Sequence, residues 1–251
     1  MLIWGFHAVT ARLKRGAEGV VELYVAQQRG DARARDLLAL ARSLGVAAHA
    51  VDMGRIDKLC PGNRHQGVVL RAEASLPLAT GLESVLQAHP EPFLLLLDGV
   101  TDPRNLGACL RVADGAGVHA VIAPKDHACP LTEVAIQTAS GAAESVPYLM
   151  VTNLARTIDT LQEHGVLVVG AADETDQTVY QMALPRSLAW VLGAEGKGMR
   201  RLTRERCDAL VRIPMAGRVS SLNVSVAAGI VLYESVRQHQ RPARAVRPPG
   251  A

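Results

Sequence analysis

The feature that most limits how this chain can fold is the segment FLLLLDGV at 93–100, which is apolar without a break until Asp98. An uninterrupted apolar run of this length is typical of a strand that is covered on both faces of a parallel sheet. Further strand-like runs lie at 118–124, 165–173, 187–195 and 209–215, and they alternate with helical patterns at about 105–117, 131–142, 153–164, 197–207 and 221–238. This alternation predicts an α/β fold with a mostly parallel sheet.

A smaller α/β unit precedes the part of the chain that contains the predicted parallel sheet. We expect strands at 20–26, 46–52 and 67–73 and a helix at 31–45, with Asp31 as its N-cap and Gly45 as its stop. The prolines and glycine around a short amphipathic stretch at 74–92 indicate a linker. The predicted organisation is therefore a first domain at 1–73, a linker at 74–92, a second domain at 93–240 and a disordered, Pro- and Arg-rich tail at 241–251.

Several classes of protein are disfavoured. No apolar run reaches the roughly 18–20 residues of a membrane span, and the N-terminus lacks a secretory pattern. The four cysteines lie far apart and no histidine has ligand spacing beside them, which argues against a zinc site and a disulfide scaffold; they are Cys60, Cys109, Cys129 and Cys207. We therefore expect a cytoplasmic protein without metal or membrane and with reduced thiols.

Positive charge is concentrated in two parts of the chain. The formal net charge is only +3, but residues 1–72 hold 11 Lys/Arg against 6 Asp/Glu, and residues 186–218 hold 8 against 3. Such segregation suits a polyanionic partner. Two solvated basic faces would give the same counts, so charge alone leaves both interpretations open.

Three segments directly follow predicted strands. In open α/β sheets, ligands gather beyond the carboxyl ends of the strands, so these segments are candidates for a binding site. The first, DGVTDPRNLGACLR at 98–111, offers Asn105 as a helix cap, Gly107 for close packing and Arg111 as a cation. The second, VLGAEGKGM at 191–199, surrounds Glu195 with three glycines, among them Gly193. Glycine-rich turns before helices often hold phosphate or nucleotide groups.

The third segment, IPMAGRVSSLN at 213–223, places Ile213 and Leu222 beside the polar Ser221 and Asn223. We expect Pro214 in a turn and the next helix to start near Ser221. Together the three loops predict a pocket for a ligand with an adenine ring and a charged amino-acid end. Neither GxGxxG nor a P-loop is present, which argues against other nucleotide-dependent enzymes.

The segments DGVTDPRNLGACLRVADGAG, VLGAEGKGM and IPMAGRVSSLNVSVAAGIVLYE resemble, in order and spacing, the three motifs of the SpoU (TrmH) family of RNA ribose 2′-O-methyltransferases. The similarity covers roughly residues 3–240. It extends, through GFHAV and NRHQGVV, to bacterial enzymes that methylate a guanosine in the peptidyl-transferase loop of 23S rRNA. The chain departs from these relatives in one place, because EVAIQTASGAAE lacks their lysine shortly before GAAESVP.

The resemblance implies a trefoil-knotted SPOUT methyltransferase domain that binds S-adenosylmethionine, and an L30e-like N-terminal domain that docks 23S rRNA. It also implies a homodimer with active sites at its interface. Residues carried over as cofactor contacts are Gly193, Ile213 and Leu222, and those carried over to the catalytic site are Asn105, Arg111, Glu195, Ser221 and Asn223.

In the implied reaction a ribose 2′-oxygen attacks the sulfonium methyl carbon, which is electrophilic enough to need no metal. Arg111 would act as the base or as a clamp on phosphate and developing negative charge. Arginine hardly ever loses its proton in proteins, which favours the clamp. Glu195 would hold Arg111 or accept a hydrogen bond from the cofactor. The alternatives are a tRNA enzyme of the same family and a non-catalytic ribosome-binding protein.

Overall fold

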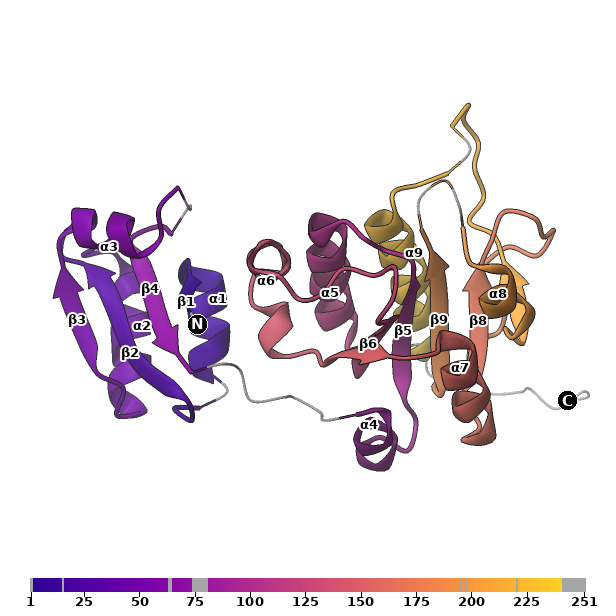
Figure 1. The fold of residues 1–251 in the computed structure, drawn as a ribbon, viewed down its shortest axis with the longest axis horizontal. Coiled ribbons are helices and arrows are strands. Elements are labelled where there is room, and N and C mark those ends of the chain that lie inside the picture. Colours follow the sequence, from indigo (N-terminus) through magenta and orange to yellow (C-terminus); the bar gives the residue numbers. More distant parts are fainter. Residues whose placement is uncertain are drawn as a thin grey trace, which may run out of the picture.

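The structure is a computed structural model that describes residues 2–14, 16–62, 65–73, 81–194, 196, 198–219 and 221–240. It contains two units, each built on its own sheet (Figure 1). The predicted disordered tail at 241–251 and residues 74–80 of the predicted linker lie outside the described residues.

The first unit has a four-stranded sheet with the order β1-β4-β2-β3. Its elements are β1 (Leu2–Trp4), α1 (Phe6–Lys14), β2 (Val20–Ala26), α2 (Ala32–Ser43), β3 (Ala48–Val51), α3 (Met53–Leu59) and β4 (Val68–Ala72). Helices α1 and α2 pack on one face of the sheet and α3 on the other. The predicted limits of α2 are confirmed, because the Asp31 carboxylate accepts from the Ala34 amide and Gly45 follows the helix with φ +70°.

The second unit has a six-stranded sheet with the order β10-β8-β9-β5-β6-β7, and every pairing is parallel. Its strands are β5 (Phe93–Asp98), β6 (Ala120–Pro124), β7 (Tyr148–Val151), β8 (Leu167–Ala171), β9 (Leu188–Gly193) and β10 (Ala209–Val211). Its helices are α4 (Leu82–Ala88), α5 (Pro103–Ala116), α6 (Glu133–Ala139), the 3-10 turn η1 (Ala142–Glu144), α7 (Leu154–Glu163), α8 (Arg201–Glu205) and α9 (Val224–His239). The α/β prediction is confirmed.

Burial on both sides explains the apolar run of β5. Leu95 and Leu97 join the core beneath α5, α6 and α9, whereas Leu94 and Leu96 join the core beneath α4 and α7. Strand β5 lies in the interior of the sheet with β9 and β6 as neighbours. The carboxyl ends of β5, β9 and β8 consequently lie next to one another, and the loops that follow them share one edge of the sheet (Figure 1). The trefoil knot stays a prediction.

Two predicted helix starts are wrong. Helix α5 begins at Pro103 with Asp102 as its cap, rather than at Asn105, because the Asp102 carboxylate accepts from the Arg104 amide and proline fits the first helical turn. Helix α9 begins at Val224, because the Asn223 side chain caps it. The prediction that Pro214 lies outside the sheet is confirmed, since β10 ends at Val211.

The helix predicted at 197–207 is shorter than expected. Ala194 and Gly198 exchange two backbone hydrogen bonds of 3.1 and 2.9 Å, and α8 begins only at Arg201. All four cysteines are free thiols, and three of them are buried. Within the described ranges, no helix combines the length and the hydropathy needed to cross a bilayer.

Candidate functional site

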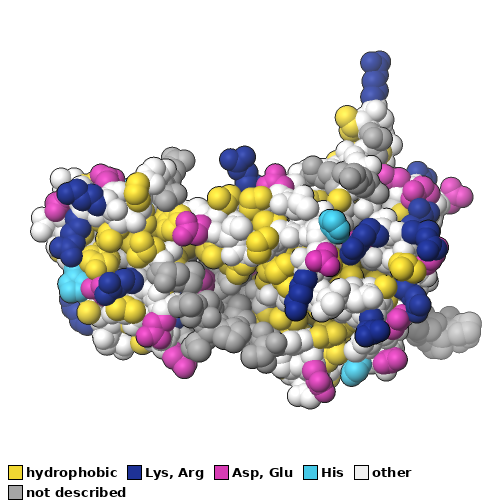
Figure 2. Space-filling view, viewed as in Figure 1, with side chains coloured by type: hydrophobic (Ala, Val, Ile, Leu, Met, Phe, Trp, Pro, Cys, Tyr) yellow, Lys and Arg dark blue, Asp and Glu magenta, His cyan; other side chains and the backbone are white. Residues whose placement is uncertain are grey.

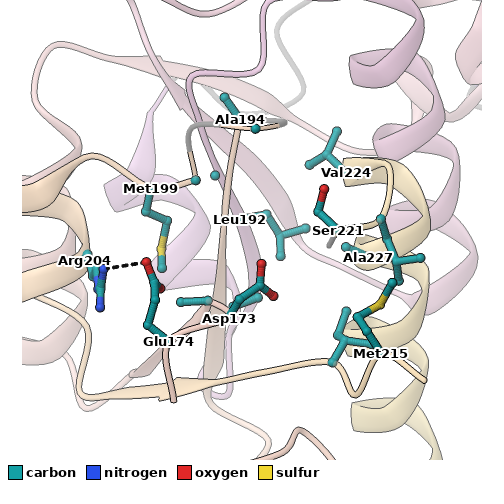
Figure 3. A pocket seen from close by; sticks show the side chains of 17 residues that line it. Asp173, Glu174, Leu192, Ala194, Met199, Arg204, Met215, Ser221, Val224 and Ala227 are labelled. Carbon is teal, nitrogen blue, oxygen red and sulfur yellow. Dashed lines mark hydrogen bonds and ion pairs between the residues drawn. The ribbon is translucent and has the colours of Figure 1, made fainter. Parts of the chain in front are cut away.

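A pocket of about 310 Å³ opens at the carboxyl ends of β8 and β9 (Figure 3). The chain segments after both strands form part of its wall, and residues between β10 and α9 close it. Of the predicted site residues, four line the pocket: Gly193, Ile213, Ser221 and Leu222. The structure therefore brings together the second and third predicted loops.

Gly193 shapes one wall because no other residue fits there. A Cβ at this position would lie 2.0 Å from the carbonyl carbon of Gly198 and 2.2 Å from the Met199 nitrogen. Both are backbone atoms, so the clash could be relieved only by moving the turn. The absence of a side chain at 193 thus lets the backbone of Gly198 and Met199 pack against the end of β9 and border the pocket.

A buried carboxylate holds this turn in place. Asp98, at the end of β5, is 1% exposed. It accepts from the Arg200 amide at 2.8 Å and from the Arg200 Nε at 2.6 Å. A buried charge that lost its partner would be strongly destabilising. The ion pair therefore ties the segment after β9 to the neighbouring strand and stabilises the wall of the pocket.

A hydrogen bond connects the first and third predicted loops. The Asn223 Nδ2 donates to the Asn105 Oδ1 at 2.9 Å, although the two residues are 118 positions apart. The Asn223 Oδ1 accepts from both the backbone and the hydroxyl of Ser225, at 2.9 and 2.6 Å. The bond joins the first turn of α5 to the start of α9, next to the pocket residues Ser221 and Val224.

Three predicted catalytic residues, Asn105, Arg111 and Asn223, are not among the residues that line the pocket. Arg111 is exposed on α5 and lies about 9 Å further along the helix axis than Asn105. Glu195 lies outside the described residues. Among the described residues, no group of three or more His, Cys, Asp or Glu could hold a metal ion.

The structure adds lining residues that the sequence analysis missed. Asp173 and Glu174 follow β8, and the Glu174 carboxylate pairs with Arg204 at 3.1 Å. The Asp173 carboxylate points into the pocket, and Figure 3 draws no ion pair for it. Met199 and Met215 add apolar walls. Asp173 is the last residue of the strand predicted at 165–173, so the sequence already places it at a carboxyl end, where ligands gather.

Much of the positive charge around the pocket is paired internally. Four arginines that follow β9 each contact a carboxylate; these are Arg200 with Asp98, Arg201 with Glu205, Arg204 with Glu174 and Arg206 with Asp159. Basic and acidic side chains alternate over this part of the surface (Figure 2). The surplus counted in 186–218 therefore overstates the charge available to a polyanion.

The SpoU rRNA Methylase family profile matches residues 92–233, and the profile for RNA 2′-O ribose methyltransferase substrate binding matches residues 2–78. The 23S rRNA (guanosine-2′-O-)-methyltransferase RlmB of Ralstonia nicotianae is 55% identical over 94% of this chain and 95% of its own length. The enzyme of the same name from Bordetella pertussis is 56% identical over 94% of this chain and 96% of its own length. The SpoU methyltransferase AviRb from Streptomyces viridochromogenes, solved with AdoMet, is 26% identical and superimposes with a TM-score of 0.76 over 95% of this chain and 90% of that one. The chain belongs to the SpoU rRNA methylase family.

Proposed function

We propose that this protein is a 23S rRNA (guanosine-2′-O-)-methyltransferase that takes its methyl group from S-adenosylmethionine. The observation that carries the proposal is the 55–56% identity, over 94% of the chain, to curated enzymes of that name. Within the rRNA we propose a guanosine of the peptidyl-transferase loop as the target. Because its substrate is ribosomal RNA, we place the enzyme in the cytoplasm.

The pocket suits S-adenosylmethionine. Its volume of about 310 Å³ lies at the lower end of the range for small-molecule sites. Leu192, Ile213 and Leu222 offer apolar contacts for an adenine ring, and the turn at Gly193 offers backbone groups for hydrogen bonds. We propose Gly193, Ile213 and Leu222 as cofactor-binding residues. Bound there, the cofactor supplies an electrophilic methyl carbon for attack by the ribose 2′-oxygen.

The chain's own residues then orient the RNA. We propose that Asn105, Ser221 and Asn223 position the ribose, since the bond between the two asparagines fixes both amides at the edge of the pocket. Arg111 stabilises negative charge on the 2′-oxygen as its proton passes to water, or clamps the adjacent phosphate through its planar fork of donors. Glu195 is proposed to hold Arg111 or the cofactor.

Transfer of a labelled methyl group tests the proposed function. The purified protein is incubated with methyl-labelled S-adenosylmethionine and with unmethylated 23S rRNA or tRNA, and the modified nucleotide is mapped. We expect one 2′-O-methylguanosine in 23S rRNA, and none when that nucleotide carries a 2′-deoxyribose. Methylation of tRNA alone would favour the alternative family member, and cofactor binding without methylation of either RNA would contradict the proposal.

Replacing Asp173 with asparagine should weaken binding of the cofactor more than binding of its demethylated product. The carboxylate points into the pocket at an exposed rim (Figure 3). S-adenosylmethionine carries a sulfonium charge that S-adenosylhomocysteine lacks, and an exposed charge interaction contributes up to about 1 kcal/mol. Titration calorimetry should show an affinity loss of about fivefold for the former only. Equal losses for both ligands would contradict this electrostatic role.

We also propose that the enzyme is a homodimer. Val226 and Tyr233, seven positions apart on α9, are 50% and 51% exposed and lie on one side of the helix. Helix α9 packs against α5, which carries Arg111, so a second copy over this face would cover both helices. An exposed apolar stripe of this kind is typical of an interface.

Val226→Asp should therefore convert the dimer to a monomer in sedimentation equilibrium, because it places a charge in the proposed interface. Leu202→Asp is the matched control, since Leu202 is 53% exposed on α8. We expect this control to remain dimeric. A dimer that survives Val226→Asp, or one that Leu202→Asp dissociates instead, would place the interface elsewhere.

A further inference from the structure

The segment between β6 and α6 presents three exposed side chains at the same edge of the sheet as the pocket. Lys125, Asp126 and His127 directly follow the carboxyl end of β6, and all three are exposed. Among the residues that the structure describes, none forms an ion pair or a side-chain hydrogen bond with any of the three. They differ in this from the four arginines after β9, each of which contacts a carboxylate. Residues 125–127 are called the β6 loop below.

Hydrogen bonds fix both ends of the β6 loop. At its start the Lys125 amide donates to the Val151 carbonyl oxygen of β7 at 2.8 Å. Just after it, the Cys129 amide donates to the Val100 carbonyl oxygen at 2.9 Å, and the Tyr148 hydroxyl donates to the Cys129 carbonyl oxygen at 2.7 Å. Cys129 is buried, so the chain returns into the core soon after the exposed residues. The neighbouring strands therefore set the position of the loop.

The backbone of His127 has an uncommon conformation. Its φ is +60°, in the left-handed region that few residues other than glycine adopt, although histidine is found there more often than most. Such a conformation persists where the surrounding structure imposes it, and it is frequent at segments that hold ligands. In the β6 loop it falls on the side chain that has an aromatic ring, and such rings stack on unpaired nucleobases.

The strand register brings the β6 loop near the pocket. Leu96 pairs with Ile122, and the same register continued by two residues sets Pro124 beside Asp98. On its other side Asp98 pairs with Gly193, which lines the pocket. The carboxyl end of β6 is therefore two strand spacings, about 10 Å, from that wall.

The loop also lies between the first unit and the pocket. The profile for RNA 2′-O ribose methyltransferase substrate binding matches the first unit. Figure 1 shows α6, to which the β6 loop leads, between the first unit and the strands β5, β9 and β8. An RNA that is held by the first unit and places a ribose at the pocket crosses this part of the surface.

We propose that the β6 loop binds the RNA strand next to the target nucleotide, with Lys125 on a phosphate and His127 stacked on an unpaired base. This inference rests on the proposed function, because it assigns a contact to the RNA of that reaction. Lysine binds phosphate as a point charge, and an aromatic ring stacks on any base. The Asp126 carboxylate, between the two, repels the same phosphates. The loop therefore contributes to the affinity for RNA and not to the choice of base.

Binding of RNA to the full chain tests the two charges of the loop. The probe is a fluorescently labelled fragment of 23S rRNA that contains the peptidyl-transferase loop, titrated at several salt concentrations. Lys125→Ala should bind it about two- to fivefold more weakly, with a salt slope that is shallower by about one. Asp126→Asn should bind it more tightly by a similar factor, because a repulsive charge is removed.

Two variants of His127 separate stacking from other roles of the side chain. His127→Asn keeps a residue that tolerates the left-handed region but removes the ring, so the affinity for the RNA fragment should fall at least about fivefold. His127→Phe keeps a ring that stacks but neither titrates nor forms hydrogen bonds. Its affinity should stay within about twofold of the wild type.

Lys125→Ala and His127→Asn should raise the KM for RNA and leave the other steps unchanged. The β6 loop does not line the pocket, so titration calorimetry should give the wild-type affinity for S-adenosylmethionine. A contact made equally before and during the reaction changes KM and not kcat. We therefore expect a kcat within about twofold of the wild type at saturating RNA.

Arg186→Ala and His164→Asn are the matched controls. Arg186 is exposed just before β9 and His164 is exposed just before β8, so both lie at the amino ends of the strands, opposite the pocket. These changes remove the same charge and the same ring as the variants of the β6 loop. We expect the wild-type affinity for RNA and the wild-type salt slope from both.

Three results would overturn the inference: wild-type RNA affinity in both Lys125→Ala and His127→Asn, an equal loss in the two controls, or a loss in His127→Phe as large as that in His127→Asn. If the wild type binds the fragment but methylates no RNA, the proposed function fails, and the titrations still decide whether the loop holds RNA. A wild type that methylates 23S rRNA while every loop variant keeps its affinity rejects the role of the loop alone.

Discussion

Replacing Arg111 with alanine is expected to abolish methyl transfer while S-adenosylmethionine still binds. Arg111 is exposed on α5 and does not line the pocket, so the cofactor affinity should not depend on it. Its proposed role is to stabilise charge that develops on the attacking oxygen, and the loss of one such donor typically costs about 100- to 1,000-fold in rate. Single-turnover transfer to 23S rRNA and calorimetry with the cofactor measure the two effects separately.

Arg156→Ala is the control for this experiment. Arg156 is an exposed cation on α7, so its removal changes the net charge by the same amount. Both the transfer rate and the affinity for RNA should remain close to the wild type. If Arg111→Ala methylated RNA at the wild-type rate, it would be neither the base nor the clamp. A loss of cofactor binding would instead place Arg111 in the methyl-donor site.

The sheet was predictable because its central strands are buried on both faces. The alternation of Leu94 and Leu96 with Leu95 and Leu97 between two cores leaves no polar position in β5 before Asp98, and the sequence shows this directly. Strand β7, at the edge of the sheet, is only partly buried and was missed, as were the short β1 and the helices α1 and α3. Such elements depend on tertiary contacts more than on a local pattern.

The helix caps show a second limit on what can be predicted from the sequence. Asp102 and Asn105 are both good capping residues, and local preference does not decide between them. Asp102 caps α5 because Pro103 occupies the first helical position. Asn105 does not cap the helix, and its side-chain oxygen accepts a hydrogen bond from Asn223. Asn223 lies 118 positions from Asn105, so no local pattern predicts this contact.

The pocket was predictable only in part. Gly193, Ile213 and Leu222 belong to loops that combine glycines or short polar side chains with apolar residues, and all three line the same pocket. Asp173 joins them because β8 lies next to β9, and strand order cannot be read from the alternation of strands and helices. Arg111 does not line this pocket, although its loop was predicted to contribute to it.

Gly193→Ala is expected to cause the largest loss of cofactor binding. The added Cβ would overlap the backbone of Gly198 and Met199 at 2.0 and 2.2 Å, so the turn that borders the pocket must move. That movement would strain the bonds by which Asp98 holds Arg200. Overpacking costs about 1–3 kcal/mol, and when this cost falls on the bound state, the affinity for S-adenosylmethionine drops by about 5- to 150-fold.

Gly217→Ala separates this steric effect from a general intolerance of alanine near the pocket. Gly217 lies in the segment between β10 and α9, has no left-handed φ, and a Cβ there would meet nothing within 4 Å. Calorimetry should give wild-type affinity for this variant, and thermal unfolding should show that both proteins are folded at the temperature of the titration. Equal affinities for the two variants would mean that the turn after β9 does not border the methyl-donor site. A folded Gly193→Ala protein that binds RNA but not the cofactor would assign that turn to the cofactor alone.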